Sequence, residues 1–192
     1  WYWIKVVNLC GNVSGFSASD SGAMAPGTPL QVTATDGVFT DFIQVSWGTS
    51  AGAPYYRVYR NEVDNSSTAI PIGSWQTETY LQDYSPPPGA TRYYWVKSSG
   101  NSSGTNPSGF GASDSGYRRL GMPTVQATEG TYSSHIAITW TSVPGATHYK
   151  VWRSYHPIFD TAEEFTFWNP DLSLNDIGAE AGRLYYYWVQ AA

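Results

Sequence analysis

Hydrophobic and polar residues alternate along short stretches of this chain, and turn residues separate the stretches. In DFIQVSW (41–47), Ile43, Val45 and Trp47 fall on one face of an extended strand. The same alternation recurs in RYYWVKSS (92–99). A period of two residues is typical of strands buried on one face, so the pattern predicts a protein built of short β-strands.

The alternating pattern itself repeats. Trp140 follows Trp47 by 93 residues, and Trp188 follows Trp95 by the same interval. The stretches that align without a gap are VTATDGVFTDFIQVSW with VQATEGTYSSHIAITW, PYYRVYR with THYKVWR, and YYWVK with YYWVQ. About seven short strands in each period, separated by turns, indicate an antiparallel β-sandwich. We therefore expect an all-β chain of tandem seven-stranded antiparallel sandwiches.

Three motifs in this order resemble those of fibronectin type III domains, which have an immunoglobulin-like fold. They are Trp47 and Trp140, the pair GAPYYRVYR and GATHYKVWR, and the pair PGATRYYWV and AGRLYYYWV. The chain looks most like the tandem domains of long bacterial extracellular proteins. The resemblance implies that Trp47 and Trp140 lie in the cores. A tyrosine that often closes the corner before the sixth strand aligns with Tyr185 but with Arg92 in the earlier repeat, so we expect that hydrogen bond only in the later one.

The repeats divide the chain into one complete and two incomplete sandwiches. Residues 1–24 correspond to the last two strands of a unit, residues 25–120 to a complete unit, and residues 121–192 to a unit without its last strand. The motif GFSASDSG (15–22) recurs as GFGASDSG (109–116). We interpret each copy as the seventh strand of a unit and its exit turn. Its aspartates suit local turn hydrogen bonds and its glycines suit crowded bends.

Two interpretations of the missing strand stay open. In the first, the sequence is a window of a longer tandem array, and the strand belongs to the same polypeptide. In the second, subunits assemble head to tail by β-strand addition and form a filament. The candidate donor strand is Gly15, Phe16, Ser17, Ala18, Ser19 and Asp20.

An aromatic stripe is the main candidate contact surface. Residues of the third and sixth strands that alternate with core positions point outward, and many of them are aromatic. We expect them to serve assembly, to bind a sugar ring, or only to stack on one another and on neighbouring Lys and Arg side chains. The stripe comprises Trp3, Tyr59, Tyr93, Trp95, Trp152, Tyr186 and Trp188.

Composition narrows the range of functions. The net charge of −5 with 13% charged residues gives no basic patch for nucleic acid, and no apolar run approaches the length of a membrane span. Cys10 is the single cysteine, so it is free or pairs between chains. Asn12, Asn65 and Asn101 fit the N-glycosylation pattern and fall in expected loops. No catalytic constellation, metal-ligand spacing or cofactor motif is present, and we expect no cofactor.

The sequence thus predicts a non-enzymatic structural protein, secreted or at a cell surface, that forms a rod or filament of tandem sandwiches. Alternatives are a spacer or carbohydrate-binding module of a larger secreted enzyme and a surface adhesin. A fixed junction between units favours the rod, and a flexible junction favours the accessory module.

Overall fold

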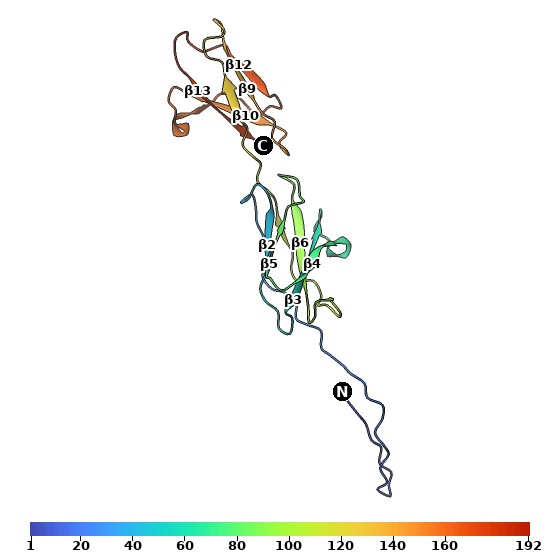
Figure 1. Cartoon of the computed structure of the whole chain (residues 1–192). Helices are drawn as coiled ribbons and strands as arrows, with labels where there is room; N and C mark the ends of the chain where they lie inside the picture. Colours follow the sequence, from blue (N-terminus) through green and yellow to red (C-terminus); the bar gives the residue numbers. More distant parts are fainter.

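The computed structural model describes all residues, 1–192, as an elongated molecule (Figure 1). Two β-sandwiches follow one another end to end, and a long hairpin extends from the end opposite the C-terminal sandwich (Figure 1). We call these parts the N-terminal hairpin (residues 1–24), the middle unit (25–120) and the last unit (121–192).

The middle unit has seven strands in two antiparallel sheets, which confirms the predicted sandwich. One sheet has the order β1-β2-β5 and the other β4-β3-β6-β7. The strands are β1 (Thr33–Ala34), β2 (Ile43–Ser46), β3 (Tyr55–Asn61), β4 (Ile70–Gln76), β5 (Tyr80–Asp83), β6 (Arg92–Ser99) and β7 (Asp114–Gly116). Pro71 lies in β4, which is an edge strand. Proline is tolerated in an edge strand because one side of the strand has no neighbour to hydrogen-bond.

The last unit has six strands. Its sheets have the orders β12-β9-β8 and β11-β10-β13, so β13 is an edge strand where the middle unit has β7 beside β6. The strands are β8 (Val125–Ala127), β9 (Ile136–Trp140), β10 (Tyr149–Ser154), β11 (Glu163–Glu164), β12 (Ser173–Asp176) and β13 (Tyr186–Ala191). Each unit also has a short 3-10 turn between its third and fourth strands: Ser66–Thr68 and Phe159–Thr161.

Each sandwich encloses its own hydrophobic core, and the two tryptophans that the repeats align lie inside. Trp47 packs on Tyr56 with ring centroids 5.9 Å apart, and Trp140 packs on Tyr149 at 6.1 Å. The alternation in DFIQVSW holds, because Ile43, Val45 and Trp47 are all buried. Each fully buried large side chain of this kind contributes roughly 1.5–3 kcal/mol, so each unit has its own source of stability.

The corner before the sixth strand differs between the units as the sequence predicts. In the last unit, the Tyr185 hydroxyl accepts a hydrogen bond from the Glu180 N–H at 3.0 Å. In the middle unit, Arg92 stands at this place and pairs with the Glu62 carboxylate at 3.0 Å instead. The two units therefore close this corner by different means.

The N-terminal hairpin is a two-stranded ribbon without a core. Main-chain bonds join Tyr2 to Asp20, Ile4 to Ser17 and Val6 to Ser14. Tyr2 and Ile4 are 75% and 69% exposed, although their counterparts in the middle unit are completely buried. A ribbon of this kind has little stability of its own in water.

Candidate interaction surface along β13

In the middle unit, residues 108–116 run along the whole length of β6. Ser108 donates its N–H to the Ser98 carbonyl at 2.9 Å, and its hydroxyl accepts from the Ser98 N–H at 3.0 Å. Further along, Tyr94 lies opposite Asp114 in the antiparallel register. β13 occupies the place of β6 in the last unit, and its outer edge has no such partner among the 192 residues. An open edge of this kind is a template for a further strand.

Two cavities lie along β13, one at each end, and we call them together the β13 groove. The cavity at the junction with the middle unit encloses about 1030 Å³ and is lined by Trp188, Gln190 and Ala192 of the last strand region. The far cavity encloses about 470 Å³ and is lined by Ala127, Thr128, Ile136, Tyr185 and Tyr187. The residues of these cavities in or next to β13 include the repeat equivalents of Arg92, Tyr94, Trp95 and Lys97, along which residues 108–116 run in the middle unit.

The seventh strand of the middle unit is also fixed to the opposite sheet, through the Asp-Ser-Gly phrase. The Asp114 carboxylate accepts the Ala34 N–H at 2.8 Å. A Cβ added at Gly116 would lie 2.8 Å from the Thr35 carbonyl oxygen and 3.0 Å from the Ile43 Cγ2. The glycine is therefore needed for close packing, as expected, but the expectation of a local turn bond for Asp114 was wrong. Its carboxylate joins two sheets instead.

The aromatic stripe is capped in both units, but by different residues. Over the register pair Tyr59 and Trp95 lies Phe110, in the segment that leads into β7, with ring centroids 5.0 and 6.4 Å away. Trp95 is thereby only 4% exposed, so the expectation that it forms part of an outer contact surface was wrong. Lys97 closes the stack, with its Nζ 4.2 Å from the Phe110 ring centroid.

In the last unit, a residue of the 3-10 turn takes the place of Phe110. Phe159 lies 5.5 Å from Trp152 and 5.8 Å from Trp188, again centroid to centroid. Trp152 and Trp188 face each other in the β10–β13 register and remain partly exposed, as does Phe159 itself. The corresponding position of the middle unit is Ser66. The last unit thus covers its aromatic pair without a seventh strand.

The other residues of the stripe are separated from this surface. Trp3 is exposed on the N-terminal hairpin, while Tyr93 and Tyr186 are half-buried at the starts of β6 and β13. The structure therefore does not bring the whole stripe together, and the partly exposed aromatic cluster is Trp152, Phe159 and Trp188.

The candidate donor strand has the same local contacts as the seventh strand of the middle unit. Ser14 donates its N–H to the Val6 carbonyl at 2.8 Å, and its hydroxyl accepts from the Val6 N–H at 3.0 Å. These are the two bonds that Ser108 makes with Ser98. The Nζ of Lys5 lies 4.1 Å from the Phe16 ring centroid, as Lys97 lies on Phe110. Within the hairpin, however, Gly22 has no atom near its Cβ position.

Arg118 anchors the start of the linker between the two sandwiches to the middle unit. Its guanidinium donates to three main-chain carbonyls of the middle unit, those of Thr40 (2.8 Å), Pro86 (2.8 Å) and Tyr84 (3.4 Å). Its own carbonyl accepts the Gly89 N–H at 2.9 Å. Two positions on, Leu120 packs against the core of the last unit. The linker is therefore fixed at both ends.

A buried acid lies in each core, and the sequence reasoning gave it no role. Asp83, 4% exposed, accepts from Arg60 at 2.7 Å and from the Tyr94 hydroxyl at 3.1 Å. Burial, followed by the charge of Asp83 and the hydrogen bond to it, raises the pKa of the Tyr94 phenol well above its usual range. Charge pairing and two donors offset the cost of burying this carboxylate.

The last unit repeats this group with Asp176, Arg153 and Tyr187. Asp176 is completely buried and accepts from Arg153 at 2.9 Å and from the Tyr187 hydroxyl at 2.8 Å. Burial, then the hydrogen bond to Asp176 and its charge, raises the pKa of the Tyr187 phenol. The signal was present in the sequence: LQD and LND align across the repeats, as do the arginines and tyrosines.

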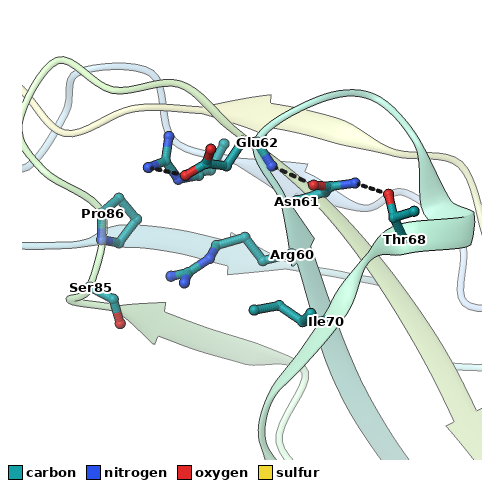
Figure 2. Close-up of a pocket in the computed structure, with 8 residues that line it drawn as sticks. Arg60, Asn61, Glu62, Thr68, Ile70, Ser85 and Pro86 are labelled. Atoms are coloured by element: carbon teal, nitrogen blue, oxygen red, sulfur yellow. Dashed lines mark hydrogen bonds and ion pairs between the residues drawn. The ribbon is translucent and has the colours of Figure 1, made fainter.

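A small cavity of about 230 Å³ lies beside the first of these groups (Figure 2). Arg60 and Arg92 line it, which suggests an anion site at first sight. Both guanidiniums already pair with carboxylates, Arg60 with Asp83 and Arg92 with Glu62. Figure 2 shows Glu62 held in its ion pair and Asn61 bonded to Thr68 at the rim. The cavity therefore has no free positive charge for an anion.

The remaining candidates lie on loops. Asn12, Asn65 and Asn101 are exposed, and Asn65 caps the 3-10 turn by accepting the Ser67 N–H. Cys10 is an exposed free thiol near the hairpin tip. No three His, Cys, Asp or Glu side chains gather where they would hold a metal ion. None of the helical segments has the length and apolar character needed to cross a membrane.

Comparison with known proteins shows the fold. No protein-family model matches the chain, and no curated protein does. A two-domain fibronectin type III segment of chicken tenascin has a TM-score of 0.61 at 14% identity, over 86% of this chain and 91% of that one. An Fn3-like protein from Clostridium thermocellum has a TM-score of 0.44 at 21% identity, over 50% and 95% of the two chains. The FN1–FN3 domains of chicken CNTN1 have a TM-score of 0.39 at 18% identity, over 98% and 70%. The likeness to the tenascin segment supports a tandem fibronectin type III-like fold.

Proposed function

We propose that the protein is a non-enzymatic structural component of an extracellular rod or filament, built from tandem sandwich units. The fixed junction at Arg118 carries this proposal. The Arg118 guanidinium binds three carbonyls of the middle unit, and Leu120 packs against the core of the last unit. These contacts would restrict the orientation of one unit relative to the next. Relative motion of domains is the default where the connection is loose. This connection suits a rod.

The two ends of the molecule carry the two halves of a similar junction. Inside the chain, the loop at Pro88 packs so closely on Gly145 that an added Cβ would overlap its carbonyl oxygen. The equivalent of Gly145 in the middle unit is Gly52, which has no atom near its Cβ position. The equivalent of Pro88 in the last unit is Ala181, which is exposed. End-to-end contact between copies would bring Ala181 of one onto Gly52 of the next.

Strand addition at β13 would make this contact durable. The open β13 edge accepts a strand, and the hairpin supplies one whose contacts match those of the middle unit's own seventh strand. Because donor and acceptor are at opposite ends of the molecule, the contact would be heterologous, and its repetition along the elongated molecule would build a filament (Figure 1).

One observation favours a second function, carbohydrate binding as an accessory module or adhesin. Phe159 and Trp188 are partly exposed beside the junction cavity, and flat aromatic faces bind sugar rings. In that case the junction cavity would be the site, and self-association would not be needed.

Sedimentation velocity over a concentration series separates the two functions. The rod predicts a weight-average mass that keeps rising above that of a dimer, and Ala51→Trp, at the bare end loop, should suppress the rise. Ser67→Trp, on the side of the same unit, is the matched control and should assemble normally. A chain that stays at 21.1 kDa throughout and is retained on an insoluble polysaccharide would favour the accessory module.

A further inference from the structure

We propose that strand β8 of the last unit selects the incoming strand by its Asp-Ser-Gly phrase. Residues 13–23 of a second copy lie along β13, the Asp20 carboxylate accepts the Ala127 N–H, and Gly22 packs on Thr128 and Ile136. This inference rests on the strand addition proposed above and names what makes it specific.

The far cavity has the residues that hold the phrase in the middle unit. There, Asp114 and Gly116 contact Ala34, Thr35 and Ile43. The repeat places Ala127, Thr128 and Ile136 at these positions of the last unit, and all three line the far cavity. The contact surface for an Asp-Ser-Gly phrase is therefore already formed there.

The Ala127 N–H is turned toward this cavity. Thr128 donates its N–H to Ala137 of β9 at 3.0 Å. Successive residues of an antiparallel strand alternate in direction, so the N–H of Ala127 points away from β9. In the middle unit, the same alternation turns the Ala34 N–H away from β2 and onto Asp114. Ala127 is exposed, whereas Ala34 is buried under β7.

The donor strand matches this geometry at Ser14, Asp20 and Gly22, whereas Phe159 already covers the aromatic pair that Phe16 would reach. Ser14, Phe16, Asp20 and Gly22 stand 94 positions before Ser108, Phe110, Asp114 and Gly116. Within the hairpin, the Asp20 carboxylate accepts only the adjacent Ser21 N–H, at 2.8 Å. On β13, the same carboxylate would gain a long-range partner, and Gly22 would gain a packed surface.

Transfer of the donor strand costs the hairpin little. Its present partner, residues 1–7, is an exposed strand that holds it through few main-chain bonds and buries none of its apolar side chains. The bonds to residues 1–7 are exchanged for equivalent bonds to β13, while Asp20 and Gly22 become packed. The sixth-strand sequence occurs both in residues 1–5 and in β13, so residues 1–7 must leave the donor strand before it can pair with β13.

Within residues 1–192 the hairpin lies at the far end of the molecule from β13, so a hairpin strand paired with β13 would come from a second copy (Figure 1). The open edge alone would accept many sequences, since main-chain bonds do not read side chains. The Asp20 carboxylate on the Ala127 N–H and Gly22 against Thr128 would make β13 select this strand over other sequences. A hydrogen bond to a charged group contributes about 1.5–3 kcal/mol, which is more than tenfold in affinity.

Fluorescence anisotropy with labelled synthetic peptides of residues 11–24 tests this on the full chain at concentrations where it is monomeric. The wild-type peptide should bind saturably, Asp20→Ala, which removes the acceptor, should weaken binding at least about tenfold, and Ser21→Ala should leave it unchanged. In the chain, Ala127→Pro removes the outward N–H without removing a ladder bond to β9, and it should make the wild-type and Asp20→Ala peptides bind alike.

The outcomes distinguish the two proposals. If no peptide binds, β13 does not take a strand from a second copy, and strand addition itself is wrong. If all peptides bind equally well to the wild-type chain, strand addition stands and selection through Asp20 is wrong. If the difference between the peptides persists on the Ala127→Pro chain, Asp20 contacts something other than the Ala127 N–H.

Discussion

The carboxylate of Asp114 accepts the main-chain N–H of Ala34 at 2.8 Å, across 80 residues of sequence. The bond links the last strand of the middle unit to its first, and so closes the sandwich across the two sheets. Without it, the Ala34 N–H would be buried under β7 without a partner, which costs about 1–3 kcal/mol. The Asp-Ser-Gly motif thus joins the two sheets of the sandwich.

The glycine of this motif should be intolerant of any side chain. In Gly116→Ala, the new Cβ would lie 2.8 Å from the Thr35 carbonyl oxygen, and strain of this kind costs typically 1–3 kcal/mol. Urea denaturation should show this loss for the middle unit. Gly22→Ala is the matched control in the hairpin, where no atom lies near the Cβ position, and the monomer should keep its stability. Equal stability of both variants would contradict the close packing.

The buried phenols should make the protein sensitive to alkali. Tyr94 and Tyr187 have raised pKa values when folded, whereas an unfolded tyrosine loses its proton near pH 10. Above about pH 10 the unfolded state therefore binds fewer protons, and the free energy of unfolding falls with rising pH. Below about pH 10 the contribution is fully present.

Urea midpoints from about pH 8 to about pH 11 measure this slope. The double variant Tyr94→Phe with Tyr187→Phe should have a flatter decline, and Tyr80→Phe, whose ring is exposed, should decline as the wild type does. A decline of the double variant as steep as that of the wild type would contradict the assignment.

Loss of the Arg118 side chain should loosen the junction without unfolding the last unit. Arg118→Met removes the donors to Thr40, Tyr84 and Pro86 and should cost the middle unit about 1–2 kcal/mol. Small-angle X-ray scattering should show a broader distribution of interatomic distances, because the units then sample more orientations. Arg119→Ala is the control, since Arg119 bonds to Phe39 through its main chain. Unchanged scattering of Arg118→Met would show that the linker is fixed by other contacts.

Phe159 should compete with the incoming strand. It covers Trp152 and Trp188 as Phe110 covers Tyr59 and Trp95, so Phe16 of a donor would need the same place. Phe159→Ala should therefore strengthen binding of the 11–24 peptide, and Phe167→Ala, in an exposed loop, should not change it. Weaker binding to Phe159→Ala would mean that Phe159 supports the donor instead of blocking it.

Local periodicity was sufficient for the fold, since strands, turns and the core positions of Trp47 and Trp140 follow from alternation and repeats. It was insufficient wherever burial depends on a partner distant in sequence. Alternation along β6 predicts that Trp95 points outward into solvent, yet Phe110 covers it. Aspartate beside serine and glycine is typical of a turn, yet the Asp114 carboxylate accepts the Ala34 N–H of the first strand. The alignment contained Asp83 and Asp176, but only the fold shows that they are buried beside tyrosines.

Negative-stain electron microscopy of the purified chain over a range of concentrations would show whether the chains join end to end. We expect unbranched strings of sandwiches that lengthen with concentration, and that shorten when excess 11–24 peptide occupies β13. Single, two-sandwich particles at every concentration, with or without the peptide, would contradict end-to-end joining of the chains.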